Sequence, residues 1–309
     1  MKSEFGQIGL NLDQAGIFIA QAAQCGAKIV LLPEFMPSGY LPTEEIWKYA
    51  ETISGRSIDW LLETAKRHHI YLGFTFVESD GKDFYNTFVL SNPDGILLGR
   101  VRKSPPCSQE AYYFRSGSDA HVIETEIGRI GIGICYENLL FKHMRLMSEA
   151  HVDFMLMPAA AGKPASSASS SDHRIKEKRK HQIKKGARSI FVDSLGVPII
   201  IANITEGRET ALPENLPSFR TGFPNTSSIV DGNGVIKAQG GEAQGIVMGE
   251  ITLNSNVGSL LQPKRYRFLW SVPVPWYSLL WWTTQKMGAF SYWRNMRRKA
   301  QAQQTYLVS

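Results

Sequence analysis

The most reactive side chain in a suggestive position is the thiol of Cys135. Residues 130–134 alternate isoleucine with glycine, which predicts a short buried strand whose small residues let another backbone approach closely. Cys135 follows this strand directly, and residues 136–138 lead into a helical pattern. A thiol at a strand-to-helix turn is held rigidly, and nearby backbone N–H groups can bind an oxyanion. The stretch therefore predicts a nucleophile, although by itself it also fits a buried structural cysteine.

Two charged side chains lie just beyond other predicted strands. Glu34 follows the apolar run of residues 28–33, and Lys103 follows a predicted strand over residues 96–101. Glu110 comes seven residues after this lysine. Active sites of α/β proteins gather at the carboxyl ends of strands, which favours a site here. A solvated loop carboxylate and a surface lysine are the commoner roles for such residues, and both remain open at this point.

Composition limits the classes of protein to which the chain can belong. Its 309 residues, 43% of them hydrophobic, suffice for one large α/β domain or two smaller ones. Three cysteines do not make a disulfide framework, so we expect a reducing compartment. The first residues hold no apolar signal-peptide core, so no signal peptide is expected. The sequence has no zinc-type Cys/His pairs, no P-loop and no dinucleotide-binding glycine motif, and we expect no metal, cofactor or nucleic acid.

Strands and helices alternate along the chain, with hairpins added, which predicts α/β layers. Helices are expected over residues 10–25, 43–52, 57–69 and 173–190, and directly after Cys135. Strands are expected over residues 28–33, 71–77, 85–90, 96–101, 130–134, 152–157, 197–203, 226–230, 235–238 and 246–251. The helix over 173–190 is strongly basic; we expect a solvated face, with contact to a membrane or an acidic partner as the alternative.

Several short motifs occur in a fixed order. They are Leu31-Leu-Pro-Glu34, Tyr85-Asn86-Thr87, Arg102-Lys103, Glu110-x-x-x-Phe114-x-x-Gly117, Gly133-Ile-Cys135-Tyr-Glu137 and Met157-Pro158. In this order and at these separations they resemble the nitrilase, or carbon–nitrogen hydrolase, superfamily over residues 8–252. The resemblance implies an α/β fold, a four-layer α-β-β-α sandwich, commonly paired across a two-fold axis. It therefore also implies a homodimer or a larger homo-oligomer.

The resemblance also implies roles for the reactive residues, as a Glu-Lys-Cys triad. Cys135 would be the nucleophile and Glu34 the general base. Lys103 would stabilise the oxyanion together with the backbone N–H of Tyr136, and Glu110 would orient the lysine and the substrate. A free thiol has a pKa near ~8.5 and is weak at neutral pH without a base or a cation, which agrees with these roles. The residues expected to contact substrate are Tyr40, Phe114, Tyr136 and Glu137.

Two features depart from the family pattern. Relatives usually begin with a strand before the first helix, whereas residues 1–9 are too short and too polar to form a convincing one. Pro105, Pro106 and Cys107 follow the lysine where many relatives carry histidine or leucine. We therefore expect unusual substrate contacts from this loop, and we expect Cys107 to be a bystander thiol.

Residues 263–309 differ from the rest, and we predict a C-terminal helical extension to a catalytic domain over residues 1–262. Residues 264–299 hold many lysines and arginines and no acidic residue, and no apolar run reaches the ~20 residues of a spanning helix. Interleaved aromatic and basic residues predict an interfacial helix on an anionic, cytoplasmic membrane surface. The expected membrane contacts are Trp270, Trp276, Trp281, Trp282 and Trp293. An arm buried against a second subunit is the alternative.

Together these features predict a membrane-associated amidase that hydrolyses a lipophilic amide, such as a fatty amide or an N-acyl compound, through a cysteine thioester. The alternatives are a true nitrilase, an acyltransferase resembling apolipoprotein N-acyltransferase, and a non-catalytic membrane scaffold. A Cys–His hydrolase that uses His143 or His151 is a further alternative. The expected location is the cytoplasmic side of the cell membrane, or else the cytoplasm.

Overall fold

The structure is a computed structural model. It describes residues 1–161, 163–164, 195–205, 208–210, 219–222, 227–241, 243–253, 263–266, 269–272 and 279–308. The basic helix predicted over 173–190 and the tryptophan at position 276 lie outside the described residues.

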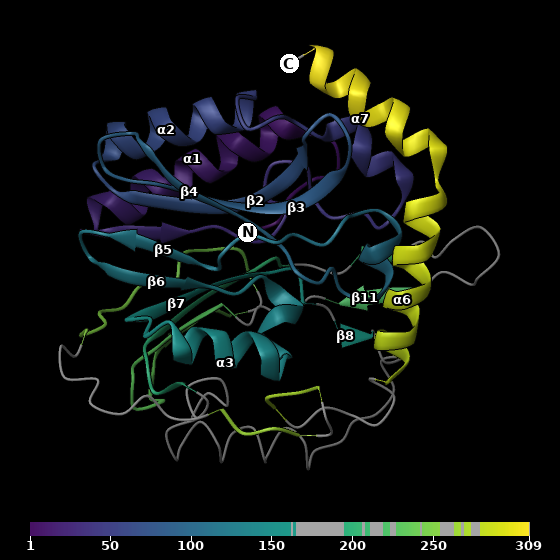
Figure 1. The fold of residues 1–309 in the computed structure, drawn as a ribbon. Coiled ribbons are helices and arrows are strands. Elements are labelled where there is room, and N and C mark those ends of the chain that lie inside the picture. The colour runs from purple at the N-terminus through teal and green to yellow at the C-terminus, as the bar shows by residue number, and fades with distance from the viewer. Residues whose placement is uncertain are drawn as a thin grey trace.

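Two β-sheets lie face to face between layers of helix, as Figure 1 shows. The first sheet has the order β1-β2-β3-β4, and its strands are β1 (Ile29–Leu31), β2 (Tyr71–Ser79), β3 (Phe84–Ser91) and β4 (Leu97–Arg102). Strands β1 and β2 are parallel, and the other neighbours are antiparallel. The helices α1 (Ile8–Gln24) and α2 (Arg56–His68) cover its outer face.

The second sheet has the order β13-β12-β9-β7-β6-β5. Its strands are β5 (Val122–Thr125), β6 (Gly128–Ile132), β7 (Phe154–Ala159), β9 (Ile199–Asn203), β12 (Ser228–Val230) and β13 (Ile236–Gln239). The central strands β6, β7 and β9 run parallel to one another, so their carboxyl ends share one edge. Helix α3 (Phe141–Glu149) covers the outer face of this sheet in Figure 1, which completes the predicted α-β-β-α sandwich.

Apolar side chains fill each interface between these layers. The two sheets meet through Phe88, Leu90, Ile130, Ile132 and Leu156, all fully buried. Burial on both faces explains why β7 reads as a continuous apolar run rather than as an alternating pattern. A third, small sheet has the order β10-β11-β8; its strands are β8 (Lys163–Pro164), β10 (Arg208–Thr210) and β11 (Phe219–Gly222).

Three predicted elements differ from the structure. The helix expected directly after Cys135 begins as the 3₁₀ helix η3 (Cys135–Leu139), and α3 starts only at Phe141. The helix predicted over residues 43–52 is a short 3₁₀ helix, η1 (Glu44–Tyr49). Residues 246–251, predicted as a strand, form none. They line a groove of about 730 Å³ together with β1, which is the edge strand of the first sheet. In the described part of the chain no strand lies between residues 246–251 and β1, so neither segment pairs with a strand across this groove. Residues 1–7 form no strand, as expected.

The C-terminal extension is helical, as predicted, and packs on the body of the same chain. Helices α6 (Leu279–Arg294) and α7 (Met296–Val308) run along the side of the sandwich in Figure 1. Gly288 lets α6 approach η2 (Ser108–Tyr112) closely, since a Cβ there would lie 2.7 Å from the ring of Tyr112. The Tyr292 hydroxyl accepts a hydrogen bond from the Phe84 N–H at 2.8 Å. None of the helices in the described part of the chain has the length and hydropathy that a membrane-spanning segment requires.

Candidate functional site

The ends of two strands of the first sheet and the short helix η2 bring three charged side chains together. Lys103 follows β4, and its Nζ lies 2.7 Å from Glu34 Oε1, beyond β1. It also lies 2.7 Å from Glu110 Oε2, which η2 supplies. All three side chains are buried: Glu34 and Lys103 are 0% exposed, and Glu110 is 4% exposed. A buried ion cluster of this kind persists only where its members pair with one another, so the positions of all three side chains are mutually fixed.

Neighbouring groups fix the orientation of the Glu34 carboxylate. The side-chain amide of Asn86 donates to Oε1 at 2.7 Å, and the backbone N–H of Ala160 donates to Oε2 at 2.7 Å. Asn86 lies in β3, and Ala160 follows β7, so both sheets hold this one side chain. Asn86 belongs to the Tyr85-Asn86-Thr87 motif, but no role was predicted for it. Its side chain is fully buried, and a buried amide needs a partner, which Glu34 provides.

The turn that carries Cys135 is held in an uncommon backbone conformation. Cys135 has a φ of 50°, in the left-handed region that residues other than glycine rarely adopt, and it begins the 3₁₀ helix η3 (Cys135–Leu139). The side-chain amide of Asn138 donates to the carbonyls of Gly133 at 2.7 Å and Cys135 at 3.1 Å. A Cβ at Gly133 would lie 1.9 Å from the Asn138 side chain, so the position of Asn138 that makes these two hydrogen bonds requires glycine at 133.

Electrostatics at the thiol favour a protonated resting state. Burial raises the pKa of Cys135 well above its ordinary value; Glu34 raises it further, and Lys103 lowers it. Burial lowers the pKa of Lys103, but Glu110 and Glu34 raise it well above its ordinary value, so this lysine is a cation. The arrangement therefore places a thiol, a fixed cation and carboxylates at one site. Proton transfer from the thiol then requires a base, and Glu34 interacts with it directly.

Glu110 gives the first testable prediction. Burial raises its pKa to about 7; Lys103 lowers this pKa and Glu34 raises it. Between about pH 4.3 and about pH 7 the folded carboxyl keeps a proton that the unfolded one has lost, so stability falls as pH rises through this window. We expect wild type to lose about 3 kcal/mol across it relative to Glu110→Gln, measured from urea midpoints at the two ends of the window.

The control for this prediction is Glu63→Gln, which removes an exposed carboxylate from α2. This variant should keep the pH dependence of wild type. Equal pH dependence in wild type and Glu110→Gln would contradict the assignment of the titration to Glu110.

Glu137 does not occupy the place predicted for a substrate contact. It is 0% exposed, and its Oε1 accepts the backbone N–H of Ser104 at 2.5 Å. Its Oε2 accepts the N–H of Ile134 at 2.7 Å, and its Oε1 lies 2.8 Å from His121 Nε2. Ser104 follows Lys103, and Ile134 precedes Cys135. One buried carboxylate thus joins the two turns that carry the lysine and the thiol, and it has no surface left for substrate.

The other three predicted substrate contacts lie around the cluster. Phe114 stacks on Phe35 at 5.4 Å, and Tyr40 also packs on Phe35 at 5.4 Å. Burial, and next Glu110, raise the pKa of Tyr40 well above its ordinary value, so its hydroxyl stays protonated beside the charged cluster. Tyr136 is 3% exposed. Phe114 and Tyr136 also border a groove of about 1030 Å³ between α6 and the body, which reaches the edge of the cluster without including Cys135.

Trp270 was predicted to contact the membrane, and this prediction is wrong. Its side chain is 1% exposed and packs edge-on against Tyr136, with ring centroids 5.7 Å apart. Trp281 is half-buried and contacts the same two rings. Trp282 and Trp293 are 42% and 69% exposed, and both border the groove between α6 and the body. The extension thus splits its tryptophans between the surroundings of the nucleophile and the outer surface.

The remaining cysteine and histidine candidates also have definite positions. Cys107 lies close enough to Glu110 and Lys103 for both to affect the pKa of its thiol, which burial raises above its ordinary range. His143 is buried beside Glu137 and packs on His121, on the outer side of the Cys135 turn. His151 follows α3 and is exposed.

The fold and the site together define a class: α-β-β-α sandwich proteins with a buried Glu–Lys–Glu cluster beside a cysteine at a strand end. The carbon–nitrogen hydrolase family model matches residues 6–257. The chain therefore belongs to the carbon–nitrogen hydrolase family, the nitrilase superfamily of the sequence analysis.

Similar proteins of known name support this membership. The omega-amidase NIT2 of Xenopus tropicalis is 36% identical over 160 residues, which are 48% of this chain and 58% of that protein. The citrullinase of Francisella tularensis is 33% identical over 161 residues, 49% of this chain and 56% of that protein. The chain thus spans somewhat over half the length of these curated relatives.

Solved structures share the fold. A carbon–nitrogen hydrolase from Helicobacter pylori superposes with a TM-score of 0.69 at 20% identity, covering 82% of this chain and 88% of that one. An amidase of the nitrilase superfamily from Nesterenkonia gives a TM-score of 0.61 at 18% identity, covering 80% of this chain and 86% of that one.

Proposed function

We propose that this protein hydrolyses a non-peptide carbon–nitrogen bond, most simply an amide, through a thioester on Cys135. The observation that carries the proposal is Lys103 held between Glu34 and Glu110 at 2.7 Å from each, beside the turn of the cysteine. The names of the relatives, omega-amidase and citrullinase, support the same class of reaction.

The proposed reaction assigns each group one task. Glu34 accepts the thiol proton as the sulfur of Cys135 attacks the amide carbonyl. Lys103 and the backbone N–H of Tyr136 stabilise the tetrahedral oxyanion. The C–N bond breaks, and Glu34 returns the proton to the leaving amine. Glu34 next takes a proton from water, which attacks the thioester; the carboxylic acid leaves and the thiol is restored. Glu110 holds the lysine in place.

We infer further that the substrate is lipophilic. Tyr40, Phe114 and Tyr136 surround the cluster with aromatic rings, and Trp270 and Trp281 back Tyr136. Apolar walls of this kind favour an acyl chain over a charged acyl group. A nitrile that reacts through a thioimidate and an amine that replaces water as acceptor remain the alternative substrates, and both would use the same thiol.

Mass spectrometry of the intact protein tests the reaction. Wild type is mixed briefly with amides and nitriles that range from acetamide to long-chain fatty amides, beside Cys135→Ala and the matched control Cys107→Ala. We expect an acyl adduct on wild type and on Cys107→Ala, none on Cys135→Ala, and the fastest labelling from a long chain. Adducts that persist on Cys135→Ala would refute the thioester, and fastest labelling by short chains would refute the lipophilic substrate.

We also propose that α6 lies on the cytoplasmic face of the cell membrane rather than in the bulk cytoplasm. This helix carries large, exposed apolar side chains: Leu279, Leu280, Trp282, Met287, Phe290 and Trp293. Lys286 and Arg294 lie over the rings of Trp282 and Phe290, at 5.8 and 5.6 Å from the ring centroids. Apolar residues flanked by cations suit the headgroup region of an anionic leaflet. On this proposal residues 263–309 form a membrane-binding segment attached to a catalytic domain over residues 1–262.

Sedimentation with lipid vesicles tests the membrane proposal. Wild type should sediment with vesicles of anionic lipid and much less with neutral ones. Phe290→Ser combined with Trp293→Ser should reduce binding at least ~10-fold, because two large apolar contacts are lost. Ile96→Ser, which removes an apolar residue of similar exposure on the body, is the control and should bind as wild type does. Unchanged vesicle binding by the double variant would refute the membrane contact. If the double variant instead loses a homodimer that wild type forms, the exposed residues of α6 contact a second subunit and not a membrane.

A further inference from the structure

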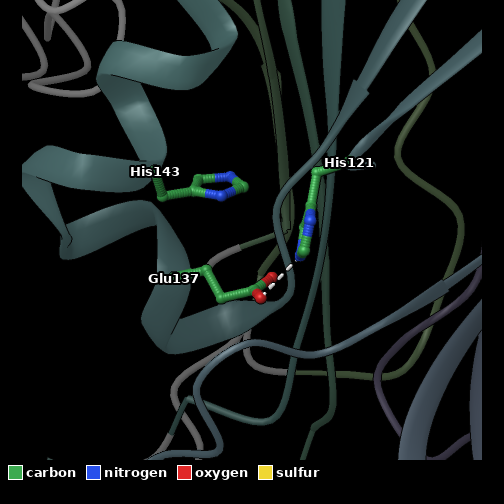
Figure 2. A group of neighbouring side chains, drawn as sticks. All are labelled: His121, Glu137 and His143. Carbon is green, nitrogen blue, oxygen red and sulfur yellow. Dashed lines mark hydrogen bonds and ion pairs between the residues drawn. The ribbon is translucent and has the colours of Figure 1, made fainter. Parts of the chain in front are cut away.

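Three side chains with metal-binding atoms converge on the outer side of the Cys135 turn, as Figure 2 shows. His121 precedes β5, Glu137 lies in η3, and His143 lies in the first turn of α3. Their ligand atoms all lie within 4.8 Å of one another. The cluster is separate from the Glu34, Lys103 and Glu110 cluster of the proposed reaction, which needs no metal.

One member of the cluster has a buried atom that nothing else explains. His143 is 4% exposed, and among the residues that the structure describes its Nε2 has no hydrogen-bond partner. In Figure 2 its ring is directed toward the space beside His121 and Glu137. A buried polar atom without a partner is rare and costly, and an ion or a water molecule is its usual explanation. Burial lowers the pKa of His143 to about 4, so the ring is neutral at neutral pH, as a metal ligand must be.

The other two members are already oriented for a ligand. His121 Nδ1 lies 3.1 Å from the carbonyl oxygen of Asp119, a bond that requires an N–H there and turns Nε2 toward Glu137. Metal-binding histidines commonly have such a carbonyl on their far nitrogen. Backbone N–H groups fix both carboxylate oxygens of Glu137; Oε1 faces His121 Nε2 with its other lone pair, and Oε2 keeps one for a further bond.

We propose that His121, Glu137 and His143 form a binding site for a divalent transition-metal ion, with Zn²⁺ as the best match. Two imidazoles and one carboxylate are a known ligand set for zinc with an open fourth position. His121 and His143 also line the groove beside α6, which gives the ion a way in and supplies water as the fourth ligand. His121 Nε2 and Glu137 Oε1 are already 2.8 Å apart, and no pair of ligand atoms is more than 4.8 Å apart. The ligand atoms of a tetrahedral zinc site lie roughly 3.3 Å apart, so the side chains must shift by at most about 1.5 Å.

Charge balance gives the site a second signature. Where His121 carries protons on both nitrogens, the ion replaces the proton between Nε2 and Glu137, and that proton passes to the buffer. Binding then releases up to one proton for each ion. The ion replaces the hydrogen bond between His121 and Glu137 as the link between His121 and the Cys135 turn.

Isothermal calorimetry with Zn²⁺ alone, in two buffers of different ionisation enthalpy, and metal analysis after dialysis test this proposal. We expect one ion per chain. His121→Asn and His143→Gln, which keep polar groups of similar size, should each lower the affinity at least ~100-fold. The control is His69→Asn. His69 is exposed and has a left-handed backbone conformation, which asparagine tolerates, so this variant should bind zinc as wild type does. Circular dichroism confirms that each variant is folded.

A thiol is the competing ligand for zinc, so Cys135→Ala combined with Cys107→Ala is the second control. This variant should retain one ion per chain. Failure of wild type to bind, binding that survives in both histidine variants, or loss of the ion in the cysteine variant would each overturn the proposal. None of these readouts depends on turnover, so the result stands apart from that of the amide assay.

Discussion

Replacing Lys103 with methionine should lower kcat/KM by at least ~10³-fold for whichever amide labels Cys135. The methionine keeps the length and apolar stem of the lysine but removes the cation that lies 2.7 Å from both Glu34 and Glu110. The tetrahedral oxyanion then loses a fixed charge, which is worth ~10²–10³-fold by itself. The two carboxylates lose their common partner, so the general base is also misplaced.

The same variant should be less stable, because it leaves buried carboxylates without a cation. We expect the free energy of unfolding to fall by about 3 kcal/mol. Lys66→Met, an exposed lysine in the last turn of α2, is the matched control and should change neither quantity measurably. If Lys103→Met keeps kcat/KM within tenfold of wild type, the lysine has no part in the chemistry, and Glu110 is the group to test next.

The convergence of the charged cluster could be predicted because the motifs that carry Glu34, Lys103 and Cys135 occur in the order and at the separations of the carbon–nitrogen hydrolase family. Each of the three residues also lies just past a predicted strand, where the active sites of α/β proteins gather. No one of these positions alone distinguishes a site from a solvated surface, so the order of the motifs decides.

The contacts between distant segments could not be predicted in the same way. Glu137 was expected to contact substrate because it is two residues from Cys135. Its real partners, Ser104 and His121, come from other segments of the chain, and no periodicity reports such a pairing. A 3₁₀ turn rather than an α-helix follows Cys135, which is what turns this carboxylate inward.

The extension shows the same limit. Aromatic composition predicts that the side chains of this segment lie in an apolar environment, but it does not distinguish the protein interior from a membrane or a second subunit. Trp270 is buried against Tyr136 inside the protein, whereas Trp293 is exposed. By contrast, the polar composition of residues 1–9 predicts that they form no strand, and in the described part of the chain no strand precedes α1 and β1 lies at the edge of its sheet.

The second large effect concerns the attachment of the extension to the body. Arg298 is 4% exposed and forms an ion pair with Asp83, which lies just before β3. Its Nε donates to the Tyr292 carbonyl at 2.8 Å, and its guanidinium lies 4.3 Å from the Tyr292 ring centroid. Replacing Arg298 with methionine should lower the free energy of unfolding by about 3 kcal/mol, because Asp83 stays buried with only the exposed Arg115 to pair with it.

Urea denaturation measures this effect, and Arg297→Met is the matched control, because Arg297 is exposed and should change stability by less than about 0.5 kcal/mol. A double-mutant cycle with Asp83→Asn separates the ion pair from the packing of the arginine stem. Equal effects of the two arginine variants would mean that α6 and α7 are not anchored through Arg298. If Arg298→Met is destabilised and also binds vesicles less well than wild type, the ion pair of Arg298 with Asp83 is needed to hold the exposed apolar residues of α6 in place. In that case the extension binds membrane only while it is packed against the body.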